Sequence, residues 1–247
     1  MNENLIFVFD GSFDGFLMIV YHYYYEKQKP IAIVSENMFQ QCLDCEYIFI
    51  KTDYEKSKRV YKAIQNINIE SAENIYIAFL NSNAGKYMSL FSYSLLIFQK
   101  KYMVEHYKQI DCVISVQKLA SAVATEAHIF TGVCRFSEME DDIYYCQIRP
   151  CHNILPLLAQ HFVDRLHTQH FIIHDISRNL AVLYDTKQWI LSEVPKEINL
   201  NFSEKEQAYR SMWKNFVQTI AVENRVSQKR QNAVLPKRLR KNMLEFW

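Results

Sequence analysis

Glycine is scarce in this chain, and the scarcity limits the folds that it can adopt. The 247 residues include four glycines and five prolines. This argues against a fold punctuated by glycine-rich nucleotide-binding turns, and against long Gly- or Pro-rich linkers. Hydrophobic residues make up 49% of the chain and aromatic residues 14%, which is enough apolar material for a packed core. We therefore expect an ordered chain with short connections.

Hydrophobic periodicity predicts an α+β fold that is helix-rich with a small antiparallel sheet. Helices are expected at about 13–27, within 54–107 with breaks near 68–70 and 81–85, at 112–130, at 155–166 and from Ser203 onward. Strands are expected at 5–9, 47–51, 133–137, 143–148, 170–174, 180–184 and 189–191. The chain is expected to form a single domain over 1–247, or two closely joined lobes of about 1–110 and 111–247.

The last long helix carries two further expectations. Ser203 and Glu206 fit a capping box, in which each side chain caps the backbone of the other. Six apolar residues follow at helical spacing: Tyr209, Met212, Trp213, Phe216, Val217 and Ile220. An apolar stripe of this kind normally faces a core, so Trp213 is expected to anchor the helix there.

The sequence predicts a cytoplasmic protein with no membrane partner. No segment reaches the roughly 20 apolar residues that a membrane helix needs, and the first ten residues lack the features of a signal peptide. The six cysteines are therefore expected to be reduced thiols.

A metal site is not expected. Cys42 and Cys45 form half of a zinc or redox motif, and Cys146, Cys151 and His152 would complete it only if the fold brought them together. Unliganded thiols are the alternative. No cysteine triplet of the radical-SAM type is present, so we expect neither a metal nor a cofactor.

Six residues are weak candidates for a catalytic site. Asp10 lies in a strand-to-helix turn, a place where anions bind, although the P-loop motif is absent. Histidines and carboxylates can transfer protons and arginine can bind anions. The candidates are Asp10, Glu126, His128, Arg135, His152 and His161. Salt bridges and packing would explain the same residues, and the sequence names no catalytic group among them.

The basic segment from Arg225 to Lys241 is the clearest functional feature. It contains seven bases and no acid, whereas residues 1–224 contain 21 bases and 26 acids. Clustered cations on an acidic body are typical of phosphate binding. The predicted phosphate contacts are Arg225, Lys229, Arg230, Lys237, Arg238, Arg240 and Lys241. A solvated basic tail is the alternative.

Six runs in the chain resemble a bacterial "probable DNA metabolism" family. They are FDGSFDGF (9–16), TEAHIFTGVCRF (125–136), HNILPLLAQHFVDR (152–165), IHDISRNLAVLYD (173–185), YRSMWKNFVQTIAVENRVSQKRQ (209–231) and LPKRLRKNMLEF (235–246). Members are often encoded beside a radical-SAM DNA repair or modification protein, or are fused to a uracil-DNA-glycosylase-like domain. The glycosylase core motif is absent here. The family's aromatic P-x-x-Y-W is replaced by the more basic Pro236–Arg240.

The resemblance implies DNA as the polyanion and a radical-SAM protein as a partner. The leading hypothesis is a DNA-binding accessory protein in repair or modification. One alternative is an enzyme that acts directly on damaged or modified bases, and whether its six candidate residues converge in one pocket would distinguish it. A second alternative is a protein-interaction module whose basic segment meets an acidic partner.

Overall fold

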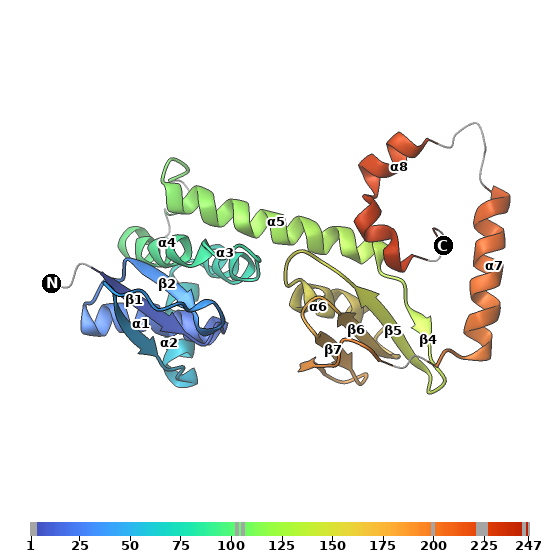
Figure 1. Ribbon diagram of the computed structural model, residues 1–247, viewed down its shortest axis with the longest axis horizontal. Helices are drawn as coiled ribbons and strands as arrows, with labels where there is room; N and C mark the ends of the chain where they lie inside the picture. Colours follow the sequence, from blue (N-terminus) through green and yellow to red (C-terminus); the bar gives the residue numbers. More distant parts are fainter. Residues whose placement is uncertain are drawn as a thin grey trace. The chain divides into compact units, whose positions relative to one another are not determined.

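The chain forms two compact units, Met1–Ala124 and Thr125–Trp247. The computed structural model describes residues 4–101, 104, 107–198, 201–220, 227–243 and 246 (Figure 1). The division between the units falls inside the long helix α5 (Asp111–Val133). Each unit combines helices with a sheet, which confirms the predicted helix-rich α+β fold.

The first unit is built on a three-stranded parallel sheet in the order β2-β1-β3. Its strands are β1 (Leu5–Phe9), β2 (Ala32–Ser35) and β3 (Glu46–Ile50). Its helices are α1 (Phe13–Glu26), α2 (Tyr54–Ile67), α3 (Ile69–Phe79), α4 (Lys86–Lys100) and the beginning of α5. The middle strand is buried, with Phe7, Val8 and Phe9 fully inaccessible, as expected for a parallel sheet that is covered by helices.

The turn between β1 and α1 is held by Asp10. Its carboxylate accepts hydrogen bonds from the Ser12 amide at 2.9 Å, the Ser12 hydroxyl at 2.7 Å and the Thr52 hydroxyl at 2.7 Å. Ser12 caps α1 as predicted, by accepting a hydrogen bond from the Gly15 amide at 2.9 Å. Partial burial raises the pKa of Asp10, but the hydrogen bonds from Ser12 and Thr52 outweigh it and the net pKa is lowered. Asp10 thus ties the end of β1 to the segment after β3.

Gly15 is needed for this close approach. A Cβ atom at Gly15 would lie 2.2 Å from Asp10 Oδ1 and 3.0 Å from Thr52 Oγ1. We therefore expect Gly15→Ala to lower the free energy of unfolding of the first unit by about 1–3 kcal/mol, although alanine favours a helix by about 1 kcal/mol over glycine. Hydrogen exchange of peptides from β1 and α1 would measure the change.

Gly132 in α5 provides the matched control, because a Cβ there has no heavy atom within 4 Å. Gly132→Ala should leave the second unit unchanged or stabilise it by up to about 1 kcal/mol. The cost of Gly15→Ala should be smaller when it is made in an Asp10→Ala background, because the clashing carboxylate is then gone. Equal effects of the two glycine substitutions would contradict the steric explanation.

The second unit contains a five-stranded sheet in the order β4-β5-β6-β7-β8. Its strands are β4 (Ser137–Glu138), β5 (Ile143–Ile148), β6 (His170–Asp175), β7 (Leu180–Tyr184) and β8 (Trp189–Glu193). The predicted antiparallel pairings β4–β5, β6–β7 and β7–β8 are present. The expectation of a purely antiparallel sheet is wrong, because β5 and β6 pair in parallel. The crossover through α6 (Leu155–Arg165) explains the parallel pair.

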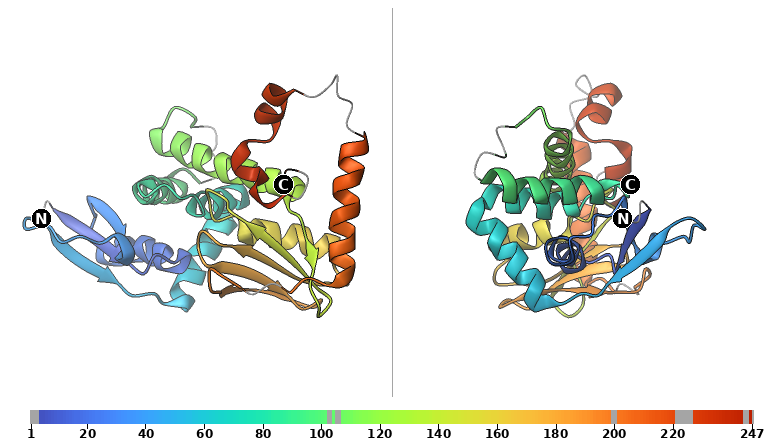
Figure 2. Two further views of the ribbon diagram at one scale, coloured as in Figure 1. Left: turned by 45° about the vertical axis from the view of Figure 1, so that its right-hand side comes forward. Right: turned by 90° about the vertical axis from the view of Figure 1, so that its left-hand side faces the viewer.

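Helix α6 supplies much of the core of this unit. It packs against β6, β7 and β8 on one face of the sheet (Figure 2). Leu155, Leu158 and Phe162 are buried as their spacing predicts. The remaining helices are the end of α5, α7 (Glu204–Ile220), α8 (Gln228–Val234) and the 3-10 helix η4 (Lys237–Asn242).

Only half of the predicted capping box forms at the start of α7. The Ser203 hydroxyl accepts a hydrogen bond from the Glu206 amide at 3.1 Å. The Glu206 carboxylate does not return to Ser203: it accepts hydrogen bonds from the Glu138 amide at 3.2 Å and from Arg210 Nε at 2.8 Å. The Ser203 amide donates instead to the Glu138 carbonyl at 3.2 Å. The start of α7 is therefore capped by Ser203 and is also joined to β4 through Glu138.

Candidate nucleic-acid interface

The basic segment folds as α8 followed by η4 (Figure 1). Ser227 caps α8 by accepting a hydrogen bond from the Arg230 amide at 3.4 Å. Leu239 and Met243 of the following segment are buried. Burial of these two side chains attaches the segment to the second unit, so it is more than a solvated tail.

Arg240 is a structural residue. It is 9% exposed, and its guanidinium donates to the Leu235 carbonyl at 3.0 Å and to Asn232 Oδ1 at 3.0 Å. It also lies over the Phe246 ring, 4.8 Å from the ring centre. These hydrogen bonds hold α8 against η4, which weakens the predicted phosphate contact of Arg240. Both acceptors are neutral oxygens, so these hydrogen bonds do not cancel its charge.

Arg238 is partly committed to an ion pair. Its Nη1 lies 3.0 Å from Glu126 Oε1 and 3.1 Å from Cys151 Sγ. The side chain of Arg238 is nevertheless 49% exposed. A phosphate can reach this guanidinium only in competition with a neighbouring carboxylate, which weakens the predicted contact without removing it.

The structure describes the side chains of three of the five other predicted phosphate contacts. Lys229, Arg230 and Lys237 are exposed. Arg225 lies outside the described residues, and Lys241 belongs to η4 with its side chain outside them. The exposed cations that the structure places in this segment are therefore Lys229, Arg230 and Lys237, with Arg238 half exposed.

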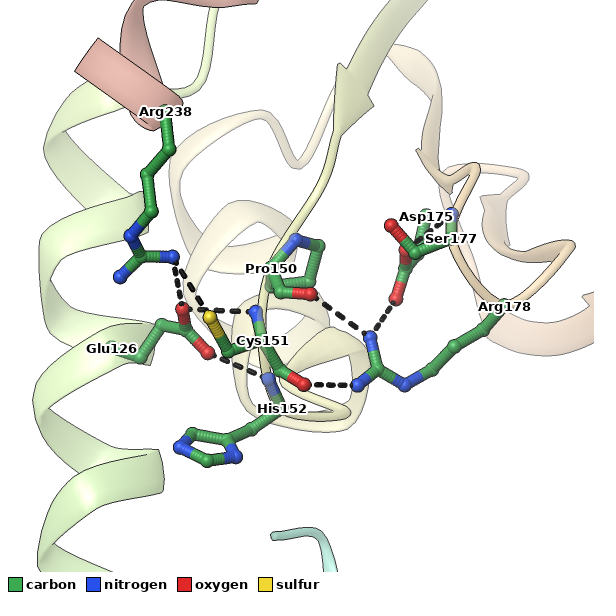
Figure 3. A network of polar contacts seen from close by, with 8 residues as sticks. All are labelled: Glu126, Pro150, Cys151, His152, Asp175, Ser177, Arg178 and Arg238. Atoms are coloured by element: carbon green, nitrogen blue, oxygen red, sulfur yellow. Dashed lines mark hydrogen bonds and ion pairs between the residues drawn. The ribbon is translucent and has the colours of Figure 1, made fainter. Parts of the chain in front are cut away.

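Glu126 of α5 is the buried centre of a polar network (Figure 3). Its carboxylate accepts hydrogen bonds from the Cys151 amide at 3.0 Å, the His152 amide at 2.7 Å and Arg238. Burial raises the pKa of Glu126, but these hydrogen bonds outweigh it and the net pKa is lowered. Glu126 is therefore an ionised carboxylate at neutral pH that joins the loop after β5 to η4.

Arg178 holds the same loop from its other side (Figure 3). Its guanidinium donates to the Pro150 carbonyl at 3.2 Å and to the Cys151 carbonyl. Arg178 is in turn paired at 2.7 Å with Asp175, whose side chain is fully buried. Asp175 also accepts a hydrogen bond from the Ser177 amide at 2.9 Å. Two charged side chains thus bind the backbone of residues 150–152.

Of the six catalytic candidates, the structure brings Glu126 and His152 together. The hydrogen bond comes from the backbone amide of His152, and the His152 side chain also interacts electrostatically with the Glu126 carboxylate. Asp10 belongs to the first unit, where it holds the β1–α1 turn.

The other three candidates lie on α5, on α6 and in the segment between α5 and β4. His128 and His161 are exposed on α5 and α6, and Arg135 donates to the Gly132 carbonyl at 3.0 Å and to the Cys134 carbonyl at 3.2 Å. The carboxylate of Glu126 is occupied by three donors. Binding is therefore better supported by this geometry than acid–base catalysis.

The sequence analysis did not identify a buried pair on the central strands. The Tyr145 hydroxyl lies 2.7 Å from His174 Nδ1. Burial raises the pKa of Tyr145 to about 12 and lowers the pKa of His174. Both side chains are therefore neutral at physiological pH, and they pack inside the sheet. Alternation along β6 places His174 on the same face as exposed His170 and half-buried Ile172, so periodicity gives no signal for its burial.

Trp213 does not anchor α7 in a core. It is 42% exposed, and its neighbours on the predicted apolar face are also exposed: Tyr209 66%, Met212 64%, Phe216 52% and Ile220 57%. The prediction of a core anchor is wrong: α7 is joined to the unit by Glu206 and Arg210, which share a helix face with Trp213 but leave its ring exposed. The Trp213 ring stacks on Phe216 with 5.8 Å between centroids.

The cysteines form no metal site in the part of the chain that the structure describes. No group of three or more His, Cys, Asp or Glu side chains is placed to hold a metal ion there. The pKa of Cys45 is raised by loss of hydration and by the neighbouring Cys42 thiol, which disfavours the thiolate that redox chemistry and metal binding require. Among the described residues, no helix is long and apolar enough to cross a membrane.

The second unit is therefore an α+β domain with a basic segment, α8 and η4. The buried carboxylate of Glu126 binds this segment through Arg238. A family model, described as a domain of unknown function (DUF4130), matches residues 84–245, about two thirds of the chain. The chain belongs to this family. Neither the curated proteins nor the solved structures contain a significant match.

Proposed function

We propose that this chain is a cytoplasmic accessory protein that binds DNA through α8 and η4 and works with a radical-SAM protein in repair or modification of DNA. The observation that carries the proposal is the exposure of Lys229, Arg230 and Lys237 on a segment that is attached to the folded unit. The resemblance of the six sequence runs to the DNA metabolism family selects DNA among polyanions.

The electrostatics of the segment support phosphate binding. Residues 225–241 contain no acid, and Glu126 is the carboxylate that pairs with Arg238. Arg240 is bonded to neutral oxygens and still contributes its charge to the local potential. Phosphates that approach the segment therefore meet exposed cations beside a fixed positive charge.

Replacing the three exposed cations tests the proposal. In a fluorescence anisotropy titration of labelled duplex DNA, log affinity should fall linearly with log salt. The triple variant Lys229→Glu, Arg230→Glu, Lys237→Glu should lose about tenfold or more in affinity. Its salt dependence should be shallower by roughly 0.9 for each phosphate contact that is lost.

Lys187 and Lys196 provide the matched control, since both are exposed in the same unit away from the basic segment. The variant Lys187→Glu, Lys196→Glu should change affinity much less than the triple variant. Equal losses of affinity for the two variants would mean that only the net charge of the protein matters. Unchanged binding by the triple variant would contradict the assignment of α8 and η4 as the DNA-binding segment. Co-purification of the tagged chain with a radical-SAM protein from its own organism would test the partner.

A further inference from the structure

A cleft in the second unit lies between α7 and the β4–β5 edge of the sheet. Its volume is about 670 Å³, which is within the range of small-molecule sites. Among the residues that the structure describes, every one that lines the cleft is aromatic or charged. The lining residues are Arg135, Phe136, Glu138, Tyr144, Lys205, Glu206, Tyr209, Arg210 and Trp213.

The aromatic walls come from both sides of the cleft. Phe136 and Tyr144 belong to the sheet side, and Tyr209 and Trp213 belong to α7. Phe136 is held by edge contacts with Phe162 at 4.9 Å and Phe171 at 5.9 Å. The Trp213 ring stacks on the Phe216 ring. Both Phe136 and Trp213 thus have aromatic neighbours, and Trp213 keeps 42% of its surface exposed to a ligand.

The charged residues of the cleft favour an anion. Glu206 is occupied by Arg210 at 2.8 Å and by the Glu138 amide. Arg210 also lies over the Phe202 ring at 3.9 Å and donates to Ser137 Oγ at 2.8 Å, so this pair closes one end of the cleft. Arg135 and exposed Lys205 then outnumber the remaining carboxylate, Glu138.

We propose that this cleft binds an unstacked base of single-stranded DNA, with the base against Trp213 and Tyr209 and its phosphate near Lys205. The inference rests on the proposed DNA binding and adds the part of DNA that this unit recognises. A nucleotide joins a flat base through its sugar to a phosphate anion, which matches walls of aromatic rings and cations. A docked apolar protein helix would be matched by aliphatic side chains, and none of the described residues that line the cleft is aliphatic.

Comparing an oligonucleotide with its abasic counterpart tests the inference. Fifteen-residue oligothymidylate and a fifteen-residue abasic strand carry the same phosphates but differ in their bases. The wild-type chain should bind oligothymidylate about tenfold or more tightly than the abasic strand. Trp213→Ala and the double variant Trp213→Ala, Tyr209→Ala should lose most of this preference while keeping affinity for the abasic strand.

Met212→Ala is the matched control on the same helix, because Met212 is 64% exposed and does not line the cleft. It should keep the preference for bases, and Trp213→Phe, which keeps an aromatic ring, should keep part of it. Unchanged affinity for the abasic strand shows that the Trp213 variants remain folded.

The outcomes separate the two proposals. If both strands bind equally and the charge-reversal variant still weakens both, the base site is wrong and the DNA-binding segment stands. If neither strand binds but duplex DNA does, the base site is wrong and the proposed function stands; if duplex DNA does not bind either, the proposed function fails as well. If Trp213→Ala changes self-association in sedimentation and leaves DNA binding unchanged, α7 is an interface between copies and the base site is overturned.

Discussion

Replacing Glu126 with alanine is expected to lower the free energy of unfolding of the second unit by about 3 kcal/mol. The substitution removes the acceptor of two backbone amides and one guanidinium, and a hydrogen bond to a charged group is worth about 1.5–3 kcal/mol. The half-exposed Arg238 regains hydration after the change, which keeps the loss below the sum of three such bonds.

Tryptophan fluorescence during denaturant unfolding would measure this loss selectively. Trp189, Trp213 and Trp247 all belong to the second unit, so their signal does not report the first. Glu197→Ala removes an exposed carboxylate from the same unit and should change stability by no more than about 0.5 kcal/mol. Similar losses for the two variants would contradict the central role of Glu126.

The contribution of Glu126 should depend on pH. Its pKa is lower in the folded protein than in the unfolded chain, so its stabilisation is complete above the unfolded value of about 4.3. It is lost as the pH falls through the folded pKa. The stability difference between the wild type and Glu126→Gln should therefore be constant from pH 6 to 8 and shrink below about pH 4. A stability difference that grows as the pH falls would contradict the lowered pKa of Glu126 in the folded protein.

Replacing Asp175 with alanine is expected to cost about 3–5 kcal/mol, which is typical for breaking a buried ion pair. Asp175 is fully buried, and its loss leaves Arg178 without its carboxylate at a site where the side chain is 23% exposed. The Ser177 amide also loses its acceptor. The same fluorescence measurement applies.

Asp185 is the matched control for Asp175. It is an exposed carboxylate of the same unit that accepts hydrogen bonds from the Lys187 and Gln188 amides. Asp185→Ala should destabilise the unit much less than Asp175→Ala, because the Asp185 carboxylate is exposed to water. Asp175→Asn keeps the volume and one acceptor, and should fall between the two alanine variants. A cost for Asp175→Ala as small as that for Asp185→Ala would show that the buried pair is not needed.

The two networks should be energetically coupled. Glu126 binds the amides of Cys151 and His152, and Arg178 binds the carbonyls of Pro150 and Cys151. Once one network is removed, the loop has less order for the other to preserve. The double variant Glu126→Ala, Asp175→Ala should therefore lose less free energy of unfolding than the sum of the losses in the two single variants.

Much of the secondary structure could be predicted because local periodicity determines it. The strand at 5–9, the helix capped by Ser12, and the breaks between α2, α3 and α4 lie where the sequence indicates. Strand β2 was not predicted, because four residues are too short to show a period. The parallel pairing of β5 with β6 depends on contacts far apart in the sequence, which periodicity does not encode.

The candidate site was predicted less completely, for a related reason. The sequence shows that Arg238 and Arg240 are cations, but their availability depends on partners from distant segments or from the local fold. Glu126 lies 112 positions away from Arg238, and no local pattern connects them. The exposure of Trp213 has the same origin: helical spacing identifies an apolar face without identifying what covers it.

The position of Glu126 on α5 determines where this protein can be shortened. A fragment that began at Thr125 would place Glu126 in the first turn of a truncated helix, where the amides lack internal acceptors and the end frays. The carboxylate that organises residues 150–152 would then depend on the least ordered turn of the fragment. A fragment that began before Asp111 would retain the four preceding turns of α5 and hold Glu126 in a helix interior. The smallest independently folding piece is therefore longer than the compact unit itself.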